Sequence, residues 1–178
     1  MFLECLNRHL AVCSAPELPA VARRDPKFWH LISIMEPFRP LVSGAGLRDV
    51  LSLRFDDAEN TETEETGIVF PTAEHIRDAF EFADARDGEP LLIQCWAGLS
   101  RSVALALGMI ARGMFLEGEA AFAQAAVETL LEIRPQARPN VLVLRLALES
   151  FLPPDKAEAM TREMVNHPVL LENRFVRW

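Results

Sequence analysis

The segment QCWAGLSRS, residues 94–102, carries residue types whose spacing suits chemistry on a phosphate group. Arg101 follows Cys95 by six positions, Gly98 lies between them, and Ser102 comes directly after. A cysteine thiolate is a nucleophile, and a guanidinium offers a planar pair of donors that matches two phosphate oxygens. Cysteine and arginine alone are weak evidence, but the glycine and the hydroxyl reduce the expected chance matches to about one in a thousand.

A loop of this kind holds an oxyanion through its backbone. It follows a short apolar run and precedes an apolar helical pattern, and a helix N-terminus offers unpaired N–H groups and a positive dipole end. Gly98 permits backbone angles that a side chain would obstruct. Ser102 can donate a hydrogen bond to the thiolate and assist it as a leaving group. The expected phosphate-binding residues are Trp96, Ala97, Gly98, Leu99, Ser100 and Arg101.

Hydrophobic periodicity predicts the elements that position this loop. Strands are expected at residues 9–13, 29–35, 49–55 and 90–94, and helices at 72–87, 103–114, 119–133 and 140–151. PELPAVARRDP is expected to be a short helix or a loop, and TAEH is a capping pattern that opens the helix at Thr72. After Pro153 and Pro154, Asp155 is expected to cap a short helix. The last residues, HPVLLENRFVRW, are expected to form a tail that packs on the domain or mediates dimerisation.

Strands that alternate with helices, followed by a helical C-terminal half, predict an α/β fold with a central, mostly parallel sheet flanked by helices. We expect a catalytic domain at residues 1–152 and a C-terminal helical extension or tail at residues 153–178.

CWAGLSRS resembles the signature loop of the protein tyrosine and dual-specificity phosphatase superfamily. ETLLEIRPQARPNVLVLRLALESF resembles the closing helices of dual-specificity phosphatases, including their Pro-Asn helix start. With the acidic loop and the following helix, the resemblance covers about residues 49–152. It departs at Gln94, where histidine is usual. The resemblance implies a phosphotyrosine phosphatase-like fold of the dual-specificity type.

The resemblance also implies a two-step reaction. Cys95 attacks phosphorus to form a cysteinyl-phosphate, which water then hydrolyses, and an aspartate gives a proton to the leaving oxygen. Asp56 and Asp57 follow the strand LSLRF. The second aspartate of a paired FDD is the acid in such phosphatases, so the resemblance implies Asp57, with Asp56 capping a turn or holding the loop. The alternative is a pair of solvated turn residues.

Residues 56–71 form a long segment rich in Asp, Glu and Thr. We interpret it as an exposed loop, and loops of more than about 12 residues in compact domains are often functional.

The composition limits which compartment and which partners are expected for the protein. The net charge of −8 argues against binding to nucleic acid or to anionic membranes, and no apolar run approaches the ~18 residues of a membrane span. The three cysteines are widely spaced, and there is no Cys/His cluster. We therefore expect a reducing, cytoplasmic compartment, with neither a metal ion nor a cofactor. The oligomeric state is not predicted.

The loop residues Trp96, Ala97, Leu99 and Ser100 are uncharged, which favours a substrate with one phosphate and an apolar or aromatic remainder. A phosphorylated protein or a small phosphomonoester fits, and the choice between phosphotyrosine and phosphoserine or phosphothreonine stays open. Trp96 lines the site or anchors the loop in the core. Two rivals are a phosphate-binding module with little turnover, which Gln94 makes conceivable, and an acyl hydrolase that pairs Cys95 with His75.

Overall fold

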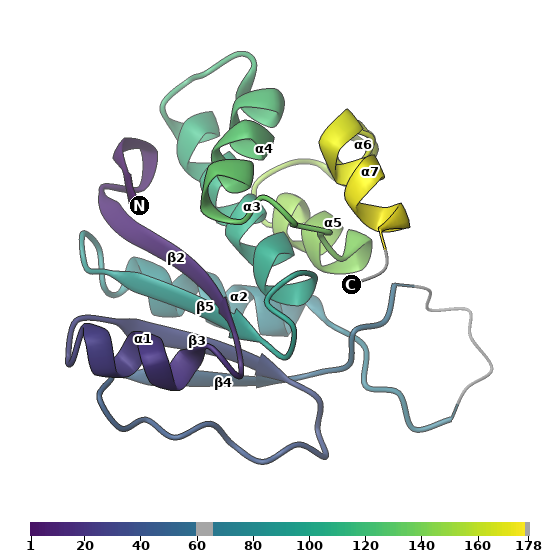
Figure 1. The fold of residues 1–178 in the computed structure, drawn as a ribbon. Coiled ribbons are helices and arrows are strands. Elements are labelled where there is room, and N and C mark those ends of the chain that lie inside the picture. The colour runs from purple at the N-terminus through teal and green to yellow at the C-terminus, as the bar shows by residue number, and fades with distance from the viewer. Residues whose placement is uncertain (60–65, 177–178) are drawn as a thin grey trace.

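A twisted sheet forms the centre of the chain (Figure 1). The computed structural model describes residues 1–59 and 66–176. Across the sheet, the strands of the described residues run in the order β1 (Phe2–Leu3), β2 (Arg8–Ser14), β5 (Leu91–Cys95), β3 (His30–Met35) and β4 (Val50–Arg54). β1 is antiparallel to β2, and the other neighbours are parallel. The expected mostly parallel sheet is confirmed.

β5 is the central strand, and all five of its residues are buried. This explains why its sequence is a short apolar run without alternation, since helices cover both faces of a parallel sheet. Its last residue, Cys95, pairs with Ser14 of β2 and Ile34 of β3. Cys95 therefore lies at the carboxyl edge of the sheet, where ligands of open α/β sheets bind.

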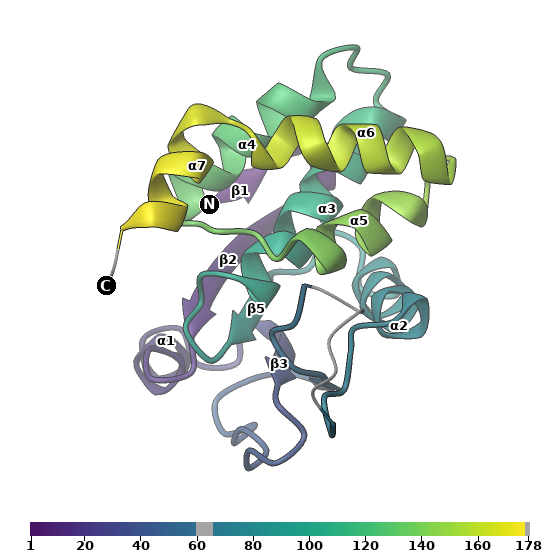
Figure 2. The same ribbon diagram turned by 90° about the vertical axis from the view of Figure 1, so that its right-hand side faces the viewer.

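Helices cover both faces of this sheet (Figures 1 and 2). They are η1 (Glu4–Leu6), α1 (Leu18–Arg24), α2 (Ala73–Asp84), α3 (Arg101–Leu116), α4 (Phe122–Ile133), α5 (Val141–Glu149), α6 (Pro154–Val165) and α7 (Pro168–Phe175). α1 packs on one face in a small cluster with Trp29, Leu31 and Leu92. The other face and the helices α2 to α7 share the main core.

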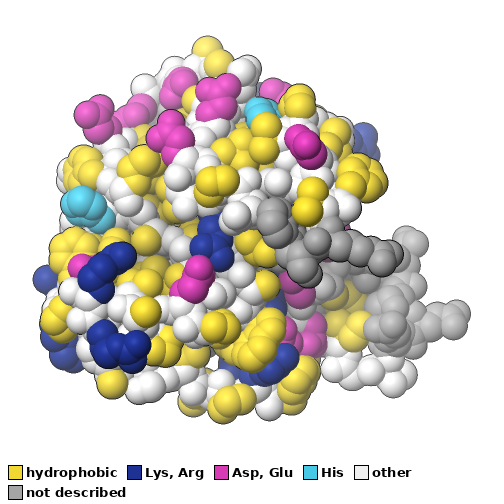
Figure 3. Space-filling model, viewed as in Figure 1, with side chains coloured by type: hydrophobic (Ala, Val, Ile, Leu, Met, Phe, Trp, Pro, Cys, Tyr) yellow, Lys and Arg dark blue, Asp and Glu magenta, His cyan; other side chains and the backbone are white. Residues whose placement is uncertain are grey.

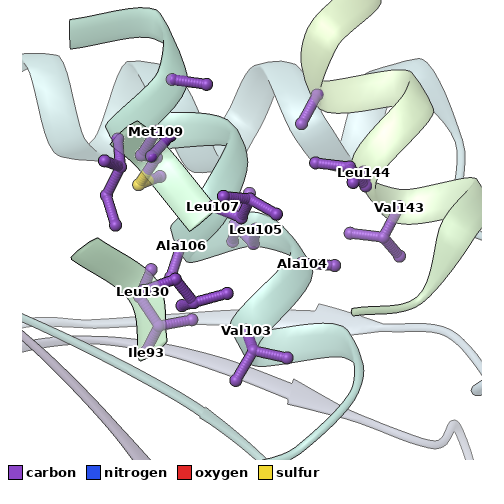
Figure 4. Close-up of a cluster of buried hydrophobic side chains, with 14 of the residues drawn as sticks. Ile93, Val103, Ala104, Leu105, Ala106, Leu107, Met109, Leu130, Val143 and Leu144 are labelled. Carbon is purple, nitrogen blue, oxygen red and sulfur yellow. The ribbon is translucent and has the colours of Figure 1, made fainter. Parts of the chain in front are cut away.

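α3 is the centre of that core (Figure 4). It passes between β5, α4 and α5, so it is apolar nearly all round. Its side chains pack against Ile93 of β5, Leu130 of α4, and Val143 and Leu144 of α5. Although α3 is strongly apolar, no helix in the described part of the chain is long and apolar enough to cross a membrane.

The predicted cap of α2 is confirmed. The Thr72 hydroxyl accepts the His75 N–H (3.4 Å), and Nδ1 of His75 accepts the Thr72 N–H (3.2 Å). The His75 ring also packs against Phe55, with 5.0 Å between ring centroids. Partial burial disfavours the imidazolium and holds the pKa of His75 below its usual range, although nearby carboxylates oppose this. Nδ1 is thus engaged at the helix cap rather than in a pair with Cys95.

The acidic loop is closed at its base by two hydrogen bonds between Asp56 and Val69. The Asp56 N–H donates to the Val69 carbonyl (2.8 Å), and the Asp56 carboxylate accepts the Val69 N–H (2.8 Å). The remaining described residues of 56–71 contain neither helix nor strand, as expected, and 60–65 lie outside the described residues.

The C-terminal part differs from the prediction in two ways. Asp155 is not the cap of α6: Pro153 holds that position, and Asp155 lies in the first turn, where its charge faces the positive end of the helix. Part of the expected tail is the helix α7, and its Leu170 is fully buried in the main core. This part of the tail therefore packs on the domain, which was one of the two expected possibilities. The sequence also did not predict β1 and η1, because two- and three-residue elements leave no periodic signal.

We expect Gly108→Ala to lower the free energy of unfolding by about 1–3 kcal/mol. A β-carbon at this position would overlap the β-carbon of Ala147, where α3 and α5 meet. Alanine favours helices over glycine by about 0.8–1.0 kcal/mol, so a loss of stability would report the contact rather than helix propensity. Urea unfolding measures the change.

The second change, Ala147→Gly, removes the partner methyl group. It should recover part of the loss when combined with Gly108→Ala. A single variant as stable as the wild type would contradict the packing.

Candidate active site

Residues 96–100 form the loop between β5 and α3, and this loop is held against β2. Gly98 has a φ of +67°, and a β-carbon there would lie 2.6 Å from the Ser14 nitrogen and 2.7 Å from the Cys13 carbonyl carbon. Glycine is therefore required both by the backbone angle and by the close approach. The Ala15 N–H also donates to the Trp96 carbonyl (3.1 Å).

The backbone N–H groups of this loop are donors of the kind that can bind an anion. In the described part of the chain, the N–H groups of residues 97–100 donate to no backbone carbonyl outside regular helices and strands. Ser100 is the N-cap of α3 and makes no side-chain cap. The loop thus combines free N–H groups with the positive end of a 16-residue helix.

The nucleophile predicted from the sequence, Cys95, lies beneath this loop with 1% of its surface exposed. Its Sγ is 3.0 Å from the Oγ of Ser102, which lies fully buried in the first turn of α3. The hydroxyl can donate to a thiolate at this distance. The structure therefore brings Cys95 and Ser102 together.

The two other cysteines, Cys5 and Cys13, both have raised thiol pKa values. Burial raises the pKa of the Cys13 thiol to about 12, with a further rise from Glu17. Burial raises the pKa of the Cys5 thiol to about 11, and Glu117 adds to this. Both residues are therefore thiols at neutral pH and poor nucleophiles.

Arg101 is buried, with only 2% of its side chain exposed. Nη1 donates to the Phe55 carbonyl (2.9 Å) at the end of β4, and Nη2 donates to Oε1 of Glu36 (2.7 Å) after β3. Nε has no hydrogen-bond partner among the described residues. A buried, unpartnered donor on a fixed guanidinium is prepared to bind an anionic oxygen.

The sequence interpretation missed Glu36, which holds Arg101. Partial burial opposes ionisation of Glu36, but its own backbone N–H and the charges of Arg101 and Arg39 keep its pKa below the usual range. Glu36 is therefore a carboxylate at neutral pH. The available signal was its position directly after the strand at 30–35, since the ends of parallel strands meet at one edge.

The two aspartates of the FDD sequence have different contacts. Asp56 is engaged with Val69 at the base of the acidic loop. Oδ1 of Asp57 accepts hydrogen bonds from Ser100 Oγ (2.7 Å) and Asn140 Nδ2 (2.8 Å). Oδ2 of Asp57 lies 3.9 Å from Nε of Arg101. The structure thus places Asp57 against the loop at residues 96–100, whereas the Asp56 carboxylate is engaged with Val69.

Asn140 is a second residue that the sequence interpretation did not assign to the site. It is fully buried, and its Oδ1 caps α5 by accepting the Val143 N–H (2.9 Å). The amide nitrogen is then directed to Asp57. The Pro-Asn helix start was recognised in the sequence, but a capping asparagine carries no sign of where its amide group points.

Gln94 fills the position where the resemblance leads one to expect histidine. It is fully buried, accepts the Ser33 hydroxyl (2.9 Å), and donates to the sulfur of Met35 (3.2 Å). Its amide group is satisfied by neutral partners and brings no charge to Cys95.

Trp96 is an exposed residue of the loop and not a core anchor. Its surface is 42% exposed, and the Arg39 guanidinium lies 3.6 Å from the centroid of its ring. Stacking of this kind places a cation and an aromatic face side by side at the rim of the loop.

Charge is unevenly distributed on the surface seen in Figure 3. Lys and Arg side chains gather mostly over the lower half, around α1 and the sheet, and Asp and Glu mostly over the upper helices. In the part of the chain described by the structure, no three His, Cys, Asp or Glu side chains are grouped so that they could hold a metal ion.

Comparison with known proteins gives matches to solved structures alone. No family model and no curated protein matches the chain. The crystal structure of DUSP15 superimposes with a TM-score of 0.57 at 21% identity, covering 99% of this chain and 96% of that one. A human tyrosine phosphatase-like serine/threonine/tyrosine-interacting protein gives 0.55 at 20% identity, covering 79% and 89%. A mouse putative dual specificity phosphatase complexed with zinc tungstate gives 0.53 at 21% identity, covering 85% and 86%.

These three matches cover 79–99% of the chain. The chain has the fold of the protein tyrosine and dual-specificity phosphatases.

Proposed function

We propose that this chain is a cysteine-dependent phosphomonoester hydrolase of the protein tyrosine or dual-specificity phosphatase type. The observation that carries the proposal is the buried Arg101 guanidinium, which Glu36 and Phe55 fix while its Nε has no hydrogen-bond partner among the described residues. The fold is shared with phosphatases of known structure, which supports the same conclusion.

In the first step, the Cys95 thiolate attacks phosphorus. The sulfur–phosphorus bond forms while the bond from phosphorus to the leaving oxygen breaks, and Asp57 gives that oxygen a proton. Arg101 and the N–H groups of the loop would bind the three non-bridging oxygens, over which the negative charge is spread in the transition state.

In the second step, water attacks the cysteinyl-phosphate and Asp57 takes its proton. The sulfur–phosphorus bond breaks, inorganic phosphate leaves, and the Cys95 thiolate is regenerated. The Ser102 hydroxyl, 3.0 Å from Sγ, would donate a hydrogen bond to the departing thiolate. Asp57 would therefore give the proton in the first step and take the proton in the second.

The proposed substrate is a phosphorylated protein or a small phosphomonoester. The residues between Cys95 and Arg101 are uncharged, so the loop itself would bind one phosphate. The exposed ring of Trp96 supports an aromatic or apolar remainder, as in phosphotyrosine. Dephosphorylation of phosphotyrosine and phosphoserine peptides, compared side by side, tests this specificity.

The competing proposal is a phosphate-binding module of the same fold with little turnover. It rests on Gln94, whose neutral contacts give the thiol no charged neighbour at that position. Hydrolysis of p-nitrophenyl phosphate by the wild type, lost on replacing Cys95, excludes it.

Cys95→Ser should abolish hydrolysis of p-nitrophenyl phosphate, because a serine hydroxyl at this position is a far weaker nucleophile than a thiolate. Tungstate binding, measured by calorimetry, should persist, since the loop and Arg101 remain. The half-exposed Cys5→Ser is the matched control and should keep full activity. Residual activity of the Cys95 variant above about 1% of wild type would show that Cys95 is not the nucleophile.

Arg101→Lys should lose about 3–5 kcal/mol of transition-state stabilisation, because a point charge replaces directed donors. The change also removes the donors to Phe55 and Glu36. The measurement is kcat/KM for p-nitrophenyl phosphate, with circular dichroism as the check on folding. Near-normal turnover would mean that Arg101 does not hold the phosphate.

Asp57→Asn should lower kcat most for substrates with poor leaving groups, and it should remove the basic limb of the pH–rate profile. Asp56→Asn is the matched control, because Asp56 holds Val69 instead of the loop. The ratio of kcat for phenyl phosphate to kcat for p-nitrophenyl phosphate reports the effect. The assignment is wrong by one residue if only the Asp56 variant changes this ratio.

A further inference from the structure

The segment between α4 and α5, residues 134–140, contacts the site from outside the sheet, and we name it the α4–α5 connection. The Arg138 N–H donates to the Leu99 carbonyl (2.8 Å), and the Asn140 N–H donates to the Ser100 carbonyl (3.4 Å). Asn140 also donates its side-chain amide to Asp57 (2.8 Å). This connection therefore contacts both the phosphate loop and the proposed acid.

The opposite side of the connection is held by α7, which runs beside it in Figure 2. Asn173 has 9% of its surface exposed. Its amide nitrogen donates to the Pro135 carbonyl (2.8 Å) and to the Ala137 carbonyl (3.0 Å). The amide group of Asn173 thus donates to two backbone carbonyl oxygens in a segment that has neither helix nor strand to supply their hydrogen bonds.

The next residue extends the contact to the acidic loop. Arg174 donates to the Pro139 carbonyl (3.0 Å), and its guanidinium lies 3.7 Å from the Glu59 carboxylate. Glu59 in turn accepts the Val141 N–H (2.8 Å) at the start of α5. α7 therefore contacts both neighbours of Asp57: the connection that carries Asn140, and the chain two residues beyond Asp57.

α7 is itself anchored, since Leu170 is fully buried in the main core. The asparagine is thus presented from a packed helix, whereas the connection that it holds has no regular structure. Hydrogen bonds from a rigid element to an irregular one restrict the irregular one.

We infer that Asn173 is a positioning residue, which holds Asp57 over the phosphate loop through the α4–α5 connection and Asn140. The inference rests on the proposed function insofar as Asp57 is the acid. It assigns to the C-terminal helix a role in the reaction, although the helix contacts no reacting atom.

Asn173→Asp tests the inference, because it replaces the donor nitrogen by an oxygen that repels both carbonyls. We expect kcat for phenyl phosphate to fall about tenfold and kcat for p-nitrophenyl phosphate to fall less than about twofold. This is the pattern expected of a displaced acid. An equal fall for both substrates, or no fall, would overturn the inference.

The matched control is Asn166→Asp, which makes the same change at the exposed C-cap of α6 and should alter neither rate. In the Asp57→Asn background, Asn173→Asp should lower kcat no further, since the residue through which it acts is already removed. Additive losses would contradict the inference. Arg174→Met should show the same leaving-group pattern, and it provides the test if Asn173→Asp does not fold.

Hydrogen exchange gives a readout that does not depend on turnover. Asn173→Asp should speed exchange of the Arg138 amide at least about tenfold, while amides of β5 stay unchanged. An unchanged rate at Arg138 would overturn the inference. If the wild type hydrolyses neither substrate, the proposed function fails, and exchange at Arg138 alone decides whether Asn173 holds the connection.

Discussion

The arrangement around the site depends on the burial of one positive charge. The Arg101 guanidinium is almost completely removed from water, which costs several kcal/mol for an unpaired ion in a protein interior. The Glu36 carboxylate and the Phe55 carbonyl offset that cost. These partners come from the ends of β3 and β4, and Arg101 opens α3. A single side chain thus links two strand ends to the helix that follows the central strand.

The position of the phosphate loop follows from this link and from contacts with β2. Gly98 lies against the backbone of Cys13 and Ser14, so the loop cannot move toward the sheet. On the same side, Glu17 accepts the Ser14 N–H (2.7 Å) and receives two hydrogen bonds from Arg134 at the end of α4. The turn after β2 and the start of the α4–α5 connection are therefore tied together beside the loop.

Irregular backbone near the site is held by buried amide side chains. Asn140 caps α5 and donates to Asp57, and Asn173 donates to two carbonyls of the connection. Asparagine suits this role because one short side chain offers both donors and an acceptor. Gln94 has a comparable structural role in the strand, where it joins Ser33 and Met35. Any stabilisation of a Cys95 thiolate must then come from the loop N–H groups, the start of α3, Arg101 and Ser102.

Local patterns in the sequence determined most of the helices and strands and indicated the candidate site residues in the 95–102 segment. The strand at 91–95, the helix after it and the turn between them follow from apolar runs and from glycine and hydroxyl residues at fixed spacing. The cap at Thr72 was also predictable, because its partners are three residues apart. Cys95, Arg101 and Ser102 lie within eight residues, so their proximity needed no knowledge of the fold.

Only the tertiary structure decided which residues surround Cys95, Arg101 and Ser102. Glu36 meets Arg101 across 65 residues, and Asn140 meets Asp57 across 83, because the order β2-β5-β3-β4 brings distant strand ends together. Asp56 and Asp57 are identical side chains on neighbouring residues, and pairing with Val69 determines which of them faces the loop. The sequence predicts a tail where α7 lies, because this segment shows no clear helical face. Its single fully buried leucine and its asparagine acquire partners only when the rest of the chain has folded.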